Sequence, residues 1–397
     1  MRIRFAEPGD EEQDARNKLL SQMDVCVARV LECTDLSRGV PPQLSAAFDA
    51  LEPGLVLFTV DGKSGTELCV SSRGRRELDG LVQLLCQKAE VAGIPLQGYA
   101  KPMRTADALA RARKATGCDL DGARVRAGFG RGHLLEISVL AESIPSVDHD
   151  ASVEAAECLV ESILGERVLD HWVRAVHCGP LPKRKALKVL QEGPAPSPTL
   201  PLDALSSTVS AAIEGLVAGL PEVPLSRSKQ DSGWTMFEVE PELASDYWGQ
   251  DDVAVATTMV PELLKCFLER APFSSLRFSR HGETFAYLKV EAVGDSVARL
   301  KARQVLEDAI GSALGPGSGC VIGNGLGIRY FYIDLALEDV TRAVPILRSV
   351  CEAQLDTPRA WLLFCDSQFV EEWVGMHRDS PPPPLQGRPV RVPRVGA

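Results

Sequence analysis

The stretch VIGNGLGIRYFYIDLAL, residues 321–337, places glycines at every second position ahead of a run of tyrosines and aliphatic residues. A glycine loop that binds a nucleotide phosphate follows a strand and opens a helix, whose N–H groups point at the phosphate. Here another strand-like run follows the glycines, which argues against a phosphate loop. The pattern predicts a hairpin that turns at GNGLG, residues 323–327. We expect Gly325 to have a positive φ angle, which favours glycine.

The run after the glycines alternates in character, so its two faces should differ. One face is apolar and should meet helices at 295–314 and 339–355; the other carries tyrosines and an acid. With strands at 284–292 and 360–366, the order of elements is βαββαβ, the split order of ferredoxin-like domains. The apolar face contains Phe331, Ile333, Leu335 and Leu337, and the opposite face contains Ile328, Tyr330, Tyr332 and Asp334, joined by Tyr287 and Lys289 if the first strand has that register.

At 397 residues the chain is too long for one ordinary core. We expect an α+β protein of two units, with mixed or antiparallel sheets and helices on one face. A second glycine hairpin, AGFGRGH, leaves a distant duplication open. The expected divisions are an N-terminal helix docked on the first unit (1–40), a first α+β domain (41–190), a Pro-rich linker with a short helix (191–232), a ferredoxin-like α+β domain (233–376) and a Pro- and Arg-rich tail (377–397).

The formal net charge is −11 and the sequence pI is about 5.2. Sequence-independent binding to nucleic acid depends on Lys and Arg contacts to phosphates, so we expect no nucleic-acid partner. The N-terminus has no secretory apolar stretch, and no segment approaches the roughly 18 apolar residues of a membrane span. The eleven cysteines are scattered without a CxxC pair. We therefore expect a cytosolic protein with reduced thiols and neither metal, cofactor nor membrane attachment.

The stretch SDYWGQDDVAV, residues 245–255, combines acids with aromatic rings in a loop that enters a strand. A solvated turn explains it, but such a loop also suits contact with a basic protein, because it offers charge and aromatic area together. The tyrosine face at 330–334 is expected to be covered by another part of the chain, or else to meet a protein partner. RNA stacking fits poorly with the acidic charge. The candidate interaction surface is Asp246, Tyr247, Trp248, Asp251, Asp252, Tyr330, Tyr332 and Asp334.

No GxSxG, HExxH, P-loop or kinase signature occurs in the chain. Catalysis stays undecided because sequence separation does not exclude residues that meet in space. The favoured hypothesis is a non-catalytic protein that binds another protein. The alternative is an enzyme or small-molecule binder with a cleft between the two halves, where Tyr330, Tyr332, Asp334 and Asp251 would converge. The sequence sets no expectation for the oligomeric state.

The C-terminal stretch MHRDSPPPPLQGRPVRVPRVGA, residues 376–397, combines a proline run with several arginines. This composition predicts an extended, polyproline-like tail. The tail is either a disordered end or an arm that binds an acidic groove, including one on this protein's own surface.

The segments ELCVSSRGRRELDGLVQLL, WTMFEVEP, QDDVAVATT and YFYIDL resemble bacterial α+β proteins classed as domains of unknown function. The resemblance covers most of residues 45–375. It implies a bacterial cytosolic α+β protein and supplies no catalytic residues. Some acidic α+β proteins of this kind are immunity partners of secreted toxins, and by analogy the negative charge would suit a basic nuclease toxin.

Overall fold

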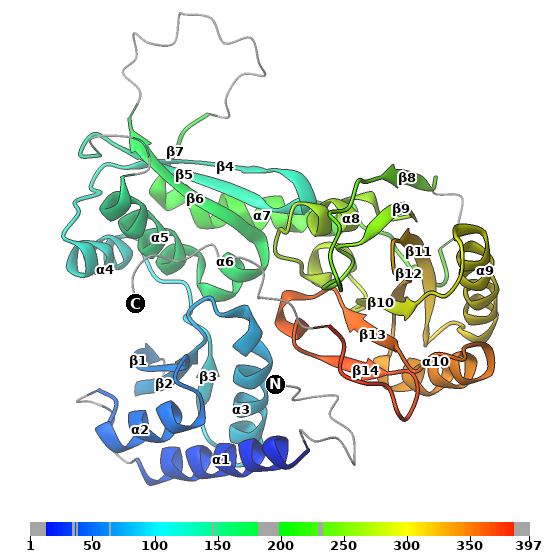
Figure 1. The fold of residues 1–397 in the computed structure, drawn as a ribbon. Coiled ribbons are helices and arrows are strands. Elements are labelled where there is room, and N and C mark those ends of the chain that lie inside the picture. Colours follow the sequence, from blue (N-terminus) through cyan, green and yellow to red (C-terminus); the bar gives the residue numbers. More distant parts are fainter. Residues whose placement is uncertain are drawn as a thin grey trace, which may run out of the picture. The chain divides into compact units, whose positions relative to one another are not determined.

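The computed structural model describes residues 13–33, 36, 39–62, 65–144, 147, 149–181, 198–228 and 233–384. These residues form helices and three β-sheets, so the α+β class is confirmed (Figure 1). The chain divides into two compact units, whose main parts are Lys18–Ala218 and Gly219–Val390. This division falls within the segment 191–232 expected as the linker. Residues 385–397 of the expected tail lie outside the described part of the chain.

The first sheet of the N-terminal unit has the strand order β1-β2-β3. β1 and β2 form an antiparallel hairpin, in which Asp61 and Gly62 lie at the end of β1, since Gly62 pairs with Gly65. β2 and β3 are parallel and are joined through α3. The elements are α1 (Gln13–Glu32), α2 (Pro42–Leu51), β1 (Val56–Gly62), β2 (Gly65–Ser71), α3 (Asp79–Val91) and β3 (Leu96–Gly98).

The second sheet of this unit has the order β6-β5-β4-β7 and its own apolar core. Its glycine hairpin is confirmed, with Gly132 at φ 66° between β4 and β5. Helix α7 belongs to this core through Leu205 and Val209, which explains why the division between the units follows α7. The elements are α4 (Thr105–Thr116), β4 (Arg124–Phe129), β5 (Leu135–Ala141), α5 (Asp150–Leu164), α6 (Glu166–Trp172), β6 (Val173–Pro180), β7 (Leu200–Pro201) and α7 (Leu205–Ala218).

A buried polar joint ties the two sheets of the N-terminal unit together. The carboxylate of Glu166 accepts hydrogen bonds from Ser71 Oγ at 2.5 Å and from the Ala100 N–H at 3.0 Å. Burial and the nearby charge of Asp170 raise the pKa of Asp79, which accepts from Ser72 Oγ, to about 8. These acids are bonded to their own unit and hold it together.

The C-terminal unit is built on one seven-stranded sheet with the order β14-β13-β10-β12-β11-β9-β8. Every neighbouring pair in it is antiparallel. The succession β10-α9-β11-β12-α10-β13 is the βαββαβ order expected from the sequence; the ferredoxin-like classification stays a prediction. The elements are β8 (Thr235–Glu238), β9 (Val253–Thr258), α8 (Pro261–Leu268), β10 (Thr284–Glu291), α9 (Ser296–Ala313), β11 (Gly319–Gly327), β12 (Tyr330–Leu337), α10 (Val340–Gln354), β13 (Ala360–Phe364) and β14 (Trp373–Gly375).

Helices α9 and α10 lie on one side of this sheet (Figure 1). Their buried side chains, such as Leu306 and Leu347, pack against Phe331, Ile333 and Leu335 of β12, as the alternation of that strand predicts. Asp295 and Asp339 cap the two helices by accepting hydrogen bonds from backbone N–H groups three residues on. The duplication that the sequence leaves open is not apparent among the described strands, because the sheets differ in strand number and order.

The predicted turn at GNGLG is wrong, because its glycines lie inside β11 and the chain turns at Ile328 and Arg329. Gly323, Gly325 and Gly327 are not among the glycines with positive φ. At Gly323 and Gly327 there is no room for a side chain. A Cβ atom on Gly323 would lie 2.6 Å from an oxygen of Asp334, and one on Gly327 would lie 2.5 Å from the carboxyl carbon of Asp252.

Substitution of Gly327 by alanine should therefore destabilise the C-terminal unit by about 1–3 kcal/mol, because the new methyl group overlaps a buried carboxylate. Substitution of Gly325 is the matched control, since its Cβ would meet only ordinary contacts at 3.5 Å or more. We expect Gly325→Ala to change stability by about 1 kcal/mol or less. Urea unfolding of both variants checks this, and equal losses would contradict it.

Candidate functional site

The side chains expected to form an interaction surface lie on the sheet face opposite α9 and α10. The segment 244–252 covers that face, and Leu264 of α8 packs beside it. Three of the eight candidates are only half-buried, namely Asp246, Trp248 and Asp251. The other five are buried by this chain itself, namely Tyr247, Asp252, Tyr330, Tyr332 and Asp334.

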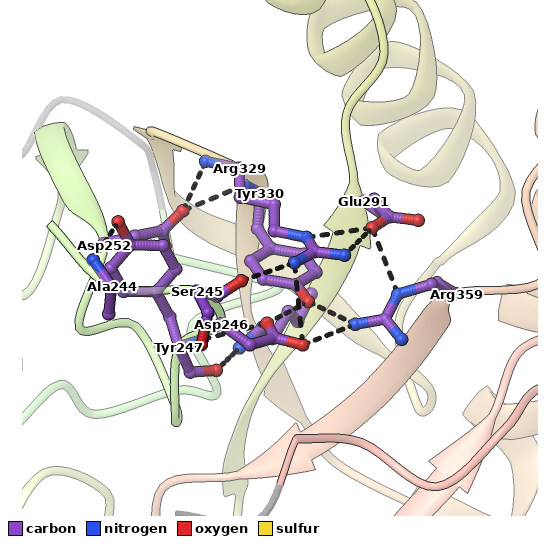
Figure 2. Close-up of polar contacts among 10 residues, drawn as sticks. Ala244, Ser245, Asp246, Tyr247, Asp252, Glu291, Arg329, Tyr330 and Arg359 are labelled. Carbon is purple, nitrogen blue, oxygen red and sulfur yellow. Dashed lines mark hydrogen bonds and ion pairs between the residues drawn. The ribbon is translucent and has the colours of Figure 1, made fainter.

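Asp252 stands where this covering segment enters β9, and its side chain is fully buried. Its carboxylate accepts hydrogen bonds from the N–H groups of Arg329 at 2.7 Å and Tyr330 at 2.9 Å (Figure 2). The hydroxyl of Tyr332 donates a third, and the backbone oxygen of Asp252 accepts from the Ile328 N–H at 3.0 Å. Asp252 alone thus accepts hydrogen bonds from the N–H groups of three successive residues at the turn between β11 and β12.

Lys289 of β10 lies fully buried on the same face, directly opposite Tyr332. Its ammonium group donates to the backbone oxygen of Tyr247 and lies 4.1 Å from the centroid of the Tyr330 ring. Burial lowers the pKa of Lys289 to about 8, although the charge of Asp252 raises it. The lysine links the covering segment to the sheet through a backbone contact, a cation–π contact and charge.

A second set of charges surrounds the hydroxyl of Tyr330. This hydroxyl donates to Asp246 and accepts from Arg359, each at 2.5 Å. Glu291 pairs with Arg329 at 2.7 Å and with Arg359 at 3.1 Å (Figure 2). Burial tends to raise the pKa of Asp246, but the Tyr330 hydroxyl, a backbone N–H and the two arginines lower it overall.

Asp334 lies beside this network and is joined to the covering segment by Gln250, whose amide donates to it at 2.9 Å. Burial raises the pKa of Asp334 to about 6. Asp251 takes no part in these contacts; it pairs with Arg270 at 3.8 Å. The side chain of Asp251 therefore pairs outside the set of candidates.

Chemically, this arrangement holds a loop in place. The central network contains three cations and three anions, so no charge is left over: Lys289, Arg329, Arg359, Asp246, Asp252 and Glu291. Its donors and acceptors form hydrogen bonds and ion pairs with other groups of the same unit. Within the part of the chain that the structure describes, no group of three or more His, Cys, Asp or Glu side chains is placed to hold a metal ion.

Four participants were missing from the sequence-based surface. Glu291, Arg329 and Arg359 look like ordinary surface charges in the sequence, and Gln250 has no distinguishing pattern. The place of Lys289 on this face had a signal, since it alternates with Tyr287 on a strand-like run.

Comparison with protein-family models, with curated proteins and with solved structures finds no match to this chain. Among the described helices, none combines the length and the apolar character required to cross a bilayer.

The raised pKa of Asp334 predicts how the stability of the C-terminal unit depends on pH. Because the folded pKa of about 6 exceeds the ordinary 3.8, the folded state binds the proton more tightly, and this group lowers stability as pH rises between these values. Asp334→Asn removes the effect while it keeps the side-chain size. Relative to the native chain, the variant should gain roughly 3 kcal/mol at most between pH 4 and pH 7.

Asp246→Asn is the control of opposite sign. The pKa of Asp246 is lowered in the folded state, so its contribution is present above the unfolded pKa and is lost as pH falls through the folded pKa. This variant should lose stability at neutral pH and approach the native chain in acid. Urea unfolding across pH measures both, and parallel profiles for the two variants would contradict the assignment.

Proposed function

We propose that this chain is a non-catalytic, cytosolic interaction protein that binds a basic protein through the outer edge of its C-terminal sheet. The observation that carries the proposal is the exposure of the segment 234–246, which we term the β8 edge. Exposed apolar side chains stand at both ends of it, and exposed acidic side chains stand between them. The exposed fractions of Trp234, Met236 and Leu243 are 44%, 65% and 86%, and Glu238, Glu240 and Glu242 are exposed as well.

The backbone of the β8 edge supports the same conclusion. β8 is the last strand of the sheet, with β9 on one side only. Pairing continues past its end, because the Val239 N–H donates to the Ala254 oxygen at 2.8 Å. The outer side of such a strand presents N–H and C=O groups to which an extended partner segment can add.

The charge of the β8 edge favours a basic partner. No ion pair joins Glu238, Glu240 or Glu242 to another described residue, so these carboxylates are available to Lys and Arg side chains. They also repel acidic strands and thereby limit edge-to-edge aggregation. In an immunity-type or regulatory role, the basic protein bound at the β8 edge would be the toxin or the regulated partner.

The interior network supports this proposal over an enzyme. Tyr330, Tyr332 and Asp334, which a catalytic cleft would need to expose, are packed against residues of their own unit. Asp251 is engaged by Arg270. Asp246 is the last residue of the β8 edge, and Trp248 lies two residues beyond it; both are half-buried, so they stay within reach of a partner.

The test compares two charge-matched triple variants of the full chain as baits in the native host's lysate. Glu238, Glu240 and Glu242 are changed to Gln in one, and the exposed acids Asp308, Glu352 and Asp356 are neutralised in the other. The β8-edge variant should retain at least tenfold less of the partner, and about 0.5 M salt should have the same effect on the native chain. Equal loss in both variants, or retention by both, would contradict the proposal.

A further inference from the structure

The last described residues fold back onto the opposite end of the C-terminal sheet. The indole N–H of Trp361, on β13, donates a hydrogen bond to the Pro381 oxygen at 2.5 Å. Just before it, the hydroxyl of Ser380 donates to the Ala360 oxygen at 3.2 Å. The Trp361 side chain is fully buried, and Pro383 is buried too. The proline run is therefore seated on the sheet.

The conformation of this segment follows from its sequence. Proline fixes its own φ angle near −65° and pushes the preceding residue into the extended region. Ser380, Pro381, Pro382 and Pro383 each precede a proline, so the segment is expected to form a polyproline II helix. Prolines carry no N–H group, so such a helix offers only carbonyl oxygens and pyrrolidine rings to a binding surface.

The surface beneath the prolines is complementary to that chemistry. Tryptophan has a single donor and no acceptor, which matches a ligand that has only acceptors. Gly375 of β14 lets the segment approach closely, since a Cβ there would lie 2.8 Å from the Ser380 Cβ. Trp361 is held by its neighbours: the Tyr330 ring centroid is 6.2 Å away, and the Arg359 guanidinium lies 5.3 Å from the Trp361 ring.

We propose that the Trp361 end of the sheet is a binding site for proline-rich segments of other proteins, and that Pro381–Pro384 occupies it as a tethered ligand. Aromatic-lined surfaces recognise polyproline II segments in this way. Among the described residues, Trp361 makes the only hydrogen bond to these four prolines. Because the prolines are tethered to the sheet, their local concentration at the site is on the order of millimolar, and this tethering accounts for much of the stability of the bound state. A proline-rich partner at high local concentration would displace it.

This site is independent of the β8 edge, because β13 and β8 lie towards opposite ends of the strand order. The two sites also select different partners. The β8 edge selects basic strands, whereas the Trp361 site selects prolines in an extended helix. Variants of one should leave binding at the other unchanged.

The experiment uses the full chain with Pro381–Pro384 changed to alanine, and a labelled peptide of sequence SPPPPLQGR as the probe, measured by fluorescence anisotropy. The four-alanine chain should bind this peptide at least tenfold more tightly than the native chain does. A peptide with alanines in place of the four prolines should not bind. Trp361→Phe in the four-alanine background should weaken binding about tenfold, since it keeps an aromatic ring and removes the N–H.

Urea unfolding shows whether each variant is folded. Pro383→Ala alone covers the case in which the four-alanine chain unfolds, and it too should bind the peptide more tightly than the native chain. Equal binding to the native and substituted folded chains would overturn the proposal, as would binding that survives Trp361→Phe undiminished. The triple Gln variant of the β8 edge should bind the peptide as the native chain does.

Discussion

The C-terminal unit depends on the buried carboxylate of Asp252. An isolated anion inside a protein costs several kcal/mol, and this one is compensated by two backbone N–H groups, the hydroxyl of Tyr332 and the charge of Lys289. Gly327 can have no side chain because the carboxylate occupies that space. The turn between the two central strands, the covering segment and the absence of a side chain at Gly327 thus all depend on one buried charge.

This interaction also decides how the site is interpreted functionally. Tyrosines, carboxylates and a lysine with shifted pKa values are typical of active sites, but structural ion networks perturb pKa values as well. Here each charge has a partner within the same unit, and the covering segment is the element that they fix. A rigid interior leaves the ends of the sheet for recognition. One end exposes the β8 edge, and the other holds the proline run against Trp361.

The sequence predicted those parts of the fold that depend on local periodicity. The alternation of β12 and the apolar stripe of α10 gave the correct helix-facing side and the βαββαβ order. The glycines of β11 were misinterpreted because glycine serves two purposes, positive φ and absence of a side chain, and only the partner strand shows which one applies. The extent of the first unit was missed because α7 is joined to it by packing and not by any local signal.

The sequence indicated only part of the network, and it did not reveal that Asp252 is buried. Acids and aromatic rings at 245–255 suggest a solvated loop, yet Asp252 is bonded to Tyr332, which lies 80 residues further on. Such pairing has no signature within a window of sequence. The lysine that completes it was visible as one alternating position on β10, but its burial was not.

The most direct test is a double-mutant cycle between Asp252→Asn and Lys289→Met. Urea unfolding followed by tryptophan fluorescence suits it, because four of the five tryptophans, at 234, 248, 361 and 373, belong to the C-terminal unit. Each single change should cost roughly 3–5 kcal/mol, because the remaining buried charge loses the opposite charge that offsets its burial, and the double variant should lose clearly less than the sum. Additive losses would contradict the claim that this buried pair organises the unit.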